Sequence, residues 1–433
     1  MTTNAELHQR RAAAVPRGVA NSLSVYLERA TNAELWDVEG KRYIDFASGI
    51  AVLNTGHRHP SVIEALKAQL EKFLHCCFQV TPYASYIELC EQLNRLTPGS
   101  TPKKSMLFST GAEAIENALK IARYHTKRPA AIAFHGSFHG RTLAAMTLTG
   151  KVQPYKAGFG PMLPSVFHAP FPNAYHGISV ADSLEAIEQL FKADVDPAQV
   201  AAIVIEPVQG EGGFNVAPPE FLRALRSLCD RHGIVLVIDE IQSGFGRTGR
   251  MFAIEHAGVE PDIMTVAKSI AGGVPLSAAI GKAEIMDAPP PGGLGGTYAG
   301  SPLGCAAALA VLEAMKREQL SDRATRLGER LQSRLQSLQK RFNVIGEIRG
   351  LGAMVAIELV RNGKADQPDA ELTRTLVQAA ARHGLVILSC GTYGNVIRFL
   401  APLTIPEALL EEGLDKLETA LKEVTQAASQ AAA

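Results

Sequence analysis

The sequence carries no excess of charge and no long hydrophobic run. Its 43 Lys and Arg residues equal its 43 Asp and Glu residues, so the formal net charge is zero. A chain without a basic field lacks the electrostatic attraction that gathers nucleic acid or anionic membranes. No stretch approaches the ~18 uninterrupted apolar residues of a membrane-spanning helix. We therefore expect partners that are small molecules, with no role for nucleic acid or a membrane.

Cysteine is scarce. Six cysteines are spread along the chain without a C-x-x-C pair, and Cys76 and Cys77 are adjacent. This spacing fits neither a zinc site nor a disulfide framework, and reduced thiols are typical of the cytosol. Only Ala12 to Pro16 separate Arg10-Arg11 from Arg17, which is too short for the ~7–15-residue apolar region of an export signal. The sequence predicts a cytoplasmic protein.

Apolar residues are plentiful, at 46% of 433 residues, and this length suggests two or three domains. In the middle of the chain, short apolar runs alternate with helical patterns such as Glu113–Arg123 and Pro219–His232. Strands buried on both faces have such runs. The alternation predicts an α/β fold with a mainly parallel, doubly wound sheet. The predicted strands are Ser105–Phe108, Ala131–Phe134, Ala201–Ile205, Ile234–Ile238, Ile263–Ala267 and Ser277–Ile280.

Both ends of the chain differ from this middle. Leu35–Phe46 alternates around a turn at Asp37–Gly40, which indicates a hairpin, and the chain after about Met315 mixes helices with short strands such as Ala353–Glu358. Thr404–Glu407 reads as a capping box before the last helix. We expect residues 1–55 and 313–424 to form one smaller α+β domain beside a large domain at 56–312. Residues 425–433 are expected to be a frayed tail.

Charged residues end three of the predicted strands. Glu206 follows Ala201–Ile205, Asp239 follows Ile234–Ile238, and Lys268 follows Ile263–Ala267. Ligands of open parallel sheets bind outside the carboxyl ends of the strands. One such residue alone would be read as a structural ion pair, but three at one edge indicate an active site.

Lys268 and Asp239 together fit pyridoxal phosphate (PLP). An amine at an apolar strand end has a lowered pKa and can form a Schiff base with an aldehyde. PLP needs that lysine and a carboxylate that keeps its ring nitrogen protonated. Ser109–Glu113 follows a strand and opens a helix, whose free N–H groups and dipole favour a phosphate.

At these residues the chain resembles the class III, fold-type I PLP-dependent aminotransferases, and among them the bacterial 4-aminobutyrate aminotransferases. The resemblance extends from Arg11 to the last helix. The motifs that carry it are Gly49-Ile50-Ala51-Val52-Leu53-Asn54-Thr55-Gly56-His57, Phe138-His139-Gly140-Arg141, Glu206-Pro207-Val208-Gln209-Gly210-Glu211-Gly212-Gly213, Asp239-Glu240-Ile241-Gln242, Ala267-Lys268-Ser269 and Gly295-Gly296-Thr297-Tyr298.

The resemblance implies a role for each site residue. Lys268 would bind the cofactor covalently and move the substrate proton, and Asp239 would pair with the ring nitrogen. The remaining cofactor residues would be Gly111 and Ala112 at the phosphate, Phe138 and Ile241 on the ring faces, Gln242 at the ring hydroxyl, Glu206 nearby, and Thr297 reaching the phosphate from the partner subunit of a homodimer or dimer of dimers. Substrate residues would be Ile50, Gln79, Arg141, Glu211 and Arg398. Many relatives have serine where this chain has Ala112.

Two arginines suit the substrates of an ω-aminotransferase. An ω-amino acid has one carboxylate and 2-oxoglutarate has two, yet both must use one pocket. Arg141 could bind the distal carboxylate of either substrate, whereas Arg398 suits only the α-carboxylate of the keto acid. A buried Arg398 left unpaired beside the amino acid would cost free energy. Glu211 could neutralise it in that half-reaction. We expect transfer from 4-aminobutyrate to 2-oxoglutarate, giving succinate semialdehyde and glutamate in a ping-pong reaction.

Several alternatives stay open. Gly244–Gly249 matches G-x-G-x-x-G, but five residues separate it from the strand and no acidic residue ends the next strand at the spacing that nicotinamide enzymes need. His135 and His139 have zinc-like spacing, but Gly136 breaks the helix they would need, so we expect no metal. A mutase or racemase would keep Lys268 and Asp239, and a non-enzymatic binding protein would need neither. 5-Aminovalerate, ornithine, acetylornithine and β-amino acids compete with 4-aminobutyrate as donors.

Overall fold

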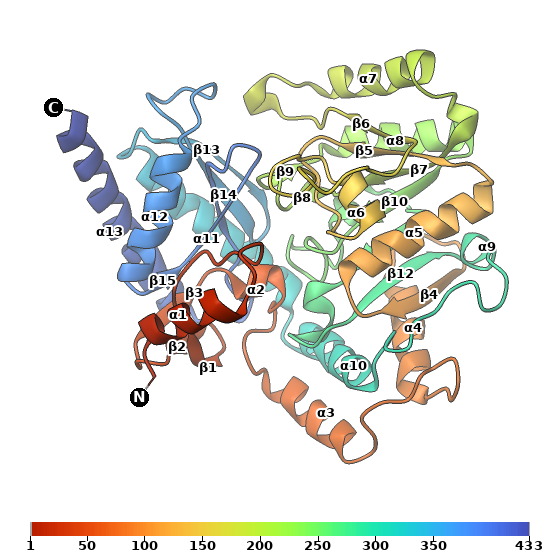
Figure 1. Ribbon diagram of the computed structural model, residues 1–433, viewed down its shortest axis with the longest axis horizontal. Helices are drawn as coiled ribbons and strands as arrows, with labels where there is room; N and C mark the ends of the chain where they lie inside the picture. The colour runs from red at the N-terminus through yellow and green to blue at the C-terminus, as the bar shows by residue number, and fades with distance from the viewer. Residues whose placement is uncertain (1, 433) are drawn as a thin grey trace.

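The computed structural model describes the backbone of residues 2–432 and the side chains of residues 2–427 (Figure 1). Its largest sheet has seven strands, and all of them run parallel except β12, which is antiparallel to both neighbours. Their order is β4 (Lys103–Phe108), β12 (Ser277–Lys282), β11 (Ile263–Val266), β10 (Val235–Asp239), β7 (Val200–Ile205), β5 (Ala130–Phe134) and β6 (Val166–Ala169).

Helices cover both faces of this sheet. Alternate residues of β7 belong to different apolar clusters: Ala202 and Val204 pack in one, Ile203 and Ile205 in the other. The first cluster includes α5 (Gly111–Thr126), α6 (Leu143–Leu148) and α9 (Ala283–Met286), and the second includes α4 (Ala84–Leu96), α7 (Val180–Ala193), α8 (Pro219–His232) and α10 (Pro302–Arg317). Since strands buried on both faces need helices on both faces, the predicted doubly wound α/β fold is confirmed.

Smaller sheets join segments from both chain ends. β1 (Leu27–Thr31), β2 (Glu34–Asp37) and β3 (Arg42–Asp45) are antiparallel, and β15 (Leu385–Val386) adds to β3 in parallel. The predicted hairpin is β2–β3. A second antiparallel sheet has the order β13 (Ile345–Leu351), β14 (Met354–Leu359), β17 (Val396–Phe399) and β16 (Leu388–Cys390). In Figure 1 the red and blue elements accordingly share one side of the molecule.

The remaining elements are helices and turns around these sheets. The helices are α1 (Asn4–Ala14), α2 (Ser48–Ala51), α3 (Pro60–Leu70), α11 (Leu320–Gln339), α12 (Ala370–Arg382) and α13 (Glu407–Ala432). A short hairpin is formed by β8 (Val208–Gln209) and β9 (Asn215–Val216), and the 3₁₀ turns are η1 (Ala174–His176), η2 (Pro197–Gln199), η3 (Ala253–Ala257) and η4 (Lys268–Ala271).

The predicted capping box at Thr404 is wrong. Helix α13 begins at Glu407, so Thr404 lies too far upstream to be its N-cap. The Thr404 hydroxyl instead donates to Asn32 Oδ1 at 2.6 Å, because the start of the helix packs against the N-terminal strands. The sequence signal was sound for a helix start and misplaced by two residues.

The domain limits stay predictions. The predicted boundary at 312/313 lies within α10, and α13 continues to Ala432 where a frayed tail was expected from residue 425. The side chains from residue 428 and the whole of Ala433 lie outside the described residues. Among residues 2–432, no helix is long and apolar enough to cross a membrane.

Candidate active site

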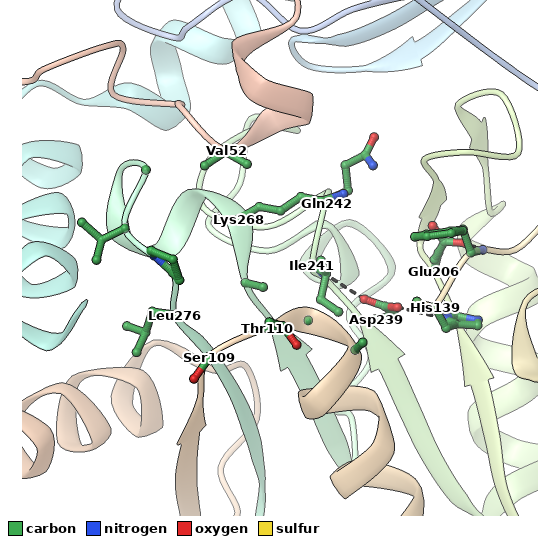
Figure 2. Close-up of a pocket in the computed structure, with 18 residues that line it drawn as sticks. Val52, Ser109, Thr110, His139, Glu206, Asp239, Ile241, Gln242, Lys268 and Leu276 are labelled. Carbon is green, nitrogen blue, oxygen red and sulfur yellow. Dashed lines mark hydrogen bonds and ion pairs between the residues drawn. The ribbon is translucent and has the colours of Figure 1, made fainter. Parts of the chain in front are cut away.

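A cavity of about 400 Å³ opens at the carboxyl ends of the parallel strands. β4, β5, β7, β10 and β11 each end at it, which is where ligands of such sheets bind. Its walls are Val52, Ser109–Ala112, Phe138–Gly140, Glu206, Asp239, Ile241, Gln242, Ala267, Lys268 and Gly273–Leu276 (Figure 2). The structure thus brings together eight predicted residues: Gly111, Ala112, Phe138, Glu206, Asp239, Ile241, Gln242 and Lys268.

Asp239 is the last residue of β10 and is held from several sides. Its Oδ1 accepts from the Ile241 N–H at 3.0 Å and from the Thr265 hydroxyl at 3.4 Å, and its Oδ2 lies 2.7 Å from Nδ1 of His139. Figure 2 shows the first and third of these contacts as dashed lines. Burial alone would lower the pKa of His139, but the hydrogen bond and charge of Asp239 outweigh it and raise the pKa. A cationic His139 therefore keeps Asp239 ionised.

Glu206 follows β7 at the same edge. Its carboxylate accepts from the backbone N–H groups of Phe138 and Gly210, both at 3.0 Å. Burial raises its pKa to about 7. Glu206 thus ties the Phe138 segment to the turn that precedes Glu211.

Lys268 opens the 3₁₀ turn η4 directly after β11. Its φ of +48° is a left-handed conformation that a non-glycine residue adopts only at an energetic cost, and such strain clusters at functional sites. Burial lowers the pKa of its ammonium group, which raises the share of free amine. The chain places a reactive amine at the cavity and fixes its direction.

The first turn of α5 forms an anion cradle. A capping box uses the Glu113 carboxylate to accept from the N–H groups of Ser109 and Thr110, at 3.0 and 2.8 Å. The N–H groups of Gly111 and Ala112 have no carbonyl within the helix to bond, so they remain available at the cavity. A Cβ on Gly111 would meet Ile241 Cδ1 at 2.9 Å, so glycine is required for this close approach.

These residues fit PLP. Lys268 offers the amine, Asp239 the carboxylate and α5 the phosphate site around one cavity. Gln242 is 6% exposed, and its buried Oε1 has no hydrogen-bond partner among the described residues. A buried polar atom without a partner is costly, so a polar group of a ligand would stabilise it.

Arg398 and Glu211 form a bidentate ion pair. Arg398 lies in the middle of β17, is 3% exposed, and reaches both carboxylate oxygens, with Nη2–Oε2 at 3.2 Å. Glu211 stands in the turn between β8 and β9, a hairpin that sequence analysis missed because its strands have two residues each. Burial would raise the pKa of Glu211, but the charge of Arg398 outweighs it and lowers the pKa. The two groups neutralise each other beside Lys268.

Arg141 stays without a carboxylate partner among the described residues, and it is exposed. Its guanidinium carbon lies 4.9 Å from the ring centre of Tyr155 and 5.9 Å from that of Phe138. Tyr155 was missed by sequence analysis, since no signal distinguishes it from a core aromatic residue. His139 was also missed, although it stands inside a quoted motif.

Three predicted residues lie outside the cavity wall of this single chain. Gln79 donates to Leu294 O at 3.1 Å and accepts from Gly296 N at 3.3 Å, so it holds the exposed loop that carries Thr297. Ile50 is 40% exposed in α2, where four consecutive residues from Ser48 have positive φ. Among the described residues, no group of three or more His, Cys, Asp or Glu side chains could hold a metal ion.

Known proteins resemble this chain over almost its entire length. The family model for class-III aminotransferases matches residues 14–421. The chain is 54% identical to 5-aminovalerate aminotransferase DavT of Pseudomonas putida, covering 98% of this chain and 99% of that protein. It is 53% identical to 4-aminobutyrate aminotransferase GabT of Escherichia coli, covering 98% and 100%. The ornithine aminotransferase structure from Toxoplasma gondii superposes with a TM-score of 0.87 at 32% identity, covering 98% and 96%. This chain therefore belongs to the class-III aminotransferases, which use PLP.

Proposed function

We propose that the protein moves the terminal amino group of 4-aminobutyrate to 2-oxoglutarate, giving succinate semialdehyde and glutamate. The ion pair between Arg398 and Glu211 beside Lys268 carries this proposal. With Arg398 neutralised, the pocket presents one free arginine, Arg141, which suits a substrate with a single carboxylate. With Glu211 displaced, it presents two arginines, which suit a dicarboxylate.

Bound PLP supplies the carbonyl group that takes up the amino group and a ring that withdraws electrons. Lys268 binds the cofactor and then carries the proton between substrate carbon and cofactor. Asp239, held ionised by His139, keeps a proton on the ring nitrogen. Gly111 and Ala112 donate to the phosphate, which compensates for the side-chain hydroxyl that Ala112 lacks. Phe138 and Ile241 contact the ring faces, Gln242 binds the ring hydroxyl, and Glu206 holds the Phe138 segment.

Substrate residues act at the mouth of the cavity. Arg141 binds the distal carboxylate, and the rings of Tyr155 and Phe138 restrict its position. Arg398 binds the α-carboxylate of the keto acid, and Ile50 and Gln79 complete the walls. A second donor, 5-aminovalerate, is favoured by the 54% identity to an enzyme named for it. The two donors differ by one methylene, which such a pocket discriminates by only about 1–3 kcal/mol.

We further propose a homodimer or dimer of dimers in the cytoplasm. Thr297 is exposed here, and Leu74, Val80 and Tyr298 near its loop are exposed apolar residues, which favours burial against a second subunit. Thr297 of the partner subunit then reaches the phosphate. Six free cysteines are in keeping with a reducing compartment.

The test is a panel of donors with 2-oxoglutarate. Purified enzyme receives β-alanine, 4-aminobutyrate, 5-aminovalerate, ornithine or acetylornithine, and glutamate formation gives kcat/KM for each. We expect 4-aminobutyrate to lead, with 5-aminovalerate within about 100-fold. A higher kcat/KM for ornithine or acetylornithine would overturn the assignment. Loss of substrate without glutamate would indicate a mutase.

A further inference from the structure

A displaced Glu211 needs a second partner, if the proposed function holds. When the keto acid gives its α-carboxylate to Arg398, the Glu211 carboxylate loses the bidentate contact that neutralises it. Glu211 is only partly exposed, so an unpaired charge there is unfavourable. It would also compete with the substrate for Arg398. Another cation within reach would remove both effects.

Most cations near Glu211 are already engaged. Lys268 holds the cofactor in the proposed function, and Arg141 takes the distal carboxylate. Arg349 is bound by Glu347 and Glu358 through Nη1, and its Nε donates to Gly213 O at 2.7 Å. None of the three has a free charge to offer.

Lys151 is different. Within residues 2–427 its ammonium group makes one hydrogen bond, to Gly391 O at 2.8 Å, and no ion pair. An ammonium group has three donors, so two remain available. Burial lowers the pKa of Lys151, and the nearby charges of Cys390 and Glu211 act in the opposite direction. Lys151 is thus a half-buried cation without a carboxylate partner, within electrostatic reach of Glu211.

One residue joins Lys151 to Glu211. Gly391 accepts from Lys151 through its carbonyl and donates to Glu211 O through its N–H at 2.9 Å. Gly391 has a φ of +93°, and a Cβ there would meet Val396 Cγ2 at 2.8 Å, so the turn is tight. This turn connects β16 to β17, the strand that carries Arg398. Lys151, Glu211 and Arg398 therefore meet at one backbone turn.

We propose that Lys151 is the second partner of Glu211: when 2-oxoglutarate occupies Arg398, the Glu211 carboxylate turns to the Lys151 ammonium. Lys151 is then a positioning residue that acts through Glu211. It lowers the cost of the displaced state, so it favours the keto-acid half-reaction over the donor half-reaction.

Lys151→Gln and Lys151→Met separate charge from anchoring. The Gln amide can still donate to Gly391 O but carries no charge, whereas Met removes both. Single-turnover kinetics would measure each half-reaction in the holoenzyme. We expect both variants to lose on the order of 10-fold in kcat/KM with 2-oxoglutarate, mainly through KM, and about twofold or less with 4-aminobutyrate. Lys151→Arg should restore most of the loss.

A double-mutant cycle tests the route through Glu211. In a Glu211→Ser background no carboxylate needs a second partner, so Lys151→Gln should change neither half-reaction further. Equal losses in both half-reactions, a loss that persists in that background, or a Lys151→Gln variant that behaves as wild type would overturn the proposal. Wild-type enzyme that fails to use 2-oxoglutarate would refute the proposed function instead.

Discussion

Nδ1 of His139 lies 2.7 Å from Oδ2 of Asp239, at the inner wall of the cavity. His139 is 2% exposed and Asp239 is 3% exposed, so the pair is shielded from solvent. The interaction raises the pKa of His139, although burial acts in the opposite direction. Because the imidazolium stabilises a charged Asp239, the carboxylate can in turn hold a proton on a ring nitrogen in the cavity.

Asp239→Asn should leave the shape of the cavity nearly unchanged and remove the negative charge. We expect the cofactor to remain bound and turnover to fall by orders of magnitude, since a neutral amide cannot keep the ring nitrogen protonated. Cofactor content by absorbance and kcat with 4-aminobutyrate would check this. His139→Gln keeps the Asp239 charge and should have a smaller effect. Near-normal kcat in Asp239→Asn would contradict the assigned role.

Lys268→Ala should abolish covalent attachment of the cofactor. Lys268 is the lysine that lines the cavity beside Asp239, and burial lowers its pKa. Borohydride reduction followed by peptide mass analysis should find the cofactor on Lys268 of the wild type and on no lysine of the variant. Lys104→Ala, at an exposed position of β4, serves as the control and should keep attachment and turnover. Trapping on another lysine would show the assignment to be wrong.

Glu211→Ser should affect the two half-reactions differently. The variant leaves Arg398 unpaired beside an amino donor with one carboxylate, whereas 2-oxoglutarate brings its own second carboxylate. A charge-assisted hydrogen bond contributes about 1.5–3 kcal/mol, so we expect a loss on the order of 10- to 100-fold in kcat/KM with 4-aminobutyrate. The change with 2-oxoglutarate should be much smaller. Equal losses in single-turnover measurements would refute the switch.

Arg247 should contribute to stability through buried contacts. It stands within Gly244–Gly249, is 0% exposed, and donates to Asn54 Oδ1 at 3.1 Å and Ala401 O at 2.7 Å. Arg247→Met leaves these acceptors unpaired, at about 1–3 kcal/mol each. We expect a lower free energy of unfolding in urea. Arg250→Met, at an exposed site three residues later, is the matched control and should change it by less than about 0.5 kcal/mol.

Glu240 should make stability depend on pH. Burial raises its pKa from 4.5 to about 7, so the folded state keeps the proton over a range in which the unfolded state has lost it. Stability from this group is therefore lost as the pH rises from about 5 to 8. Glu240→Gln resembles the protonated acid and should remove this loss, by up to about 3 kcal/mol. The difference in Tm between variant and wild type, measured at pH 5 and pH 8, should shift in favour of the variant. A constant difference would contradict the pKa assignment.

Local patterns were sufficient for much of the large sheet. Pro219–His232 was predicted with the limits that the structure has, and the run Ile263–Ala267 became β11 at Ile263–Val266. β6 (Val166–Ala169) was missed, because a four-residue strand carries too little periodicity to distinguish it from a loop. Continuous apolar runs locate strands since burial on both faces selects them residue by residue.

The sequence by itself determined which chemical groups stand at the strand ends. Lys268, Asp239 and Glu206 follow apolar runs, so their place at one edge is a consequence of parallel strands alone. Only the tertiary structure decided the pairing of these groups with distant residues. Glu211 and Arg398 are 187 positions apart, and their contact requires β17 to lie beside the β8–β9 turn. The same holds for His139 with Asp239 and for Lys151 at Gly391. Periodicity reports which face of its own element a side chain occupies, whereas these contacts depend on how elements pack against one another.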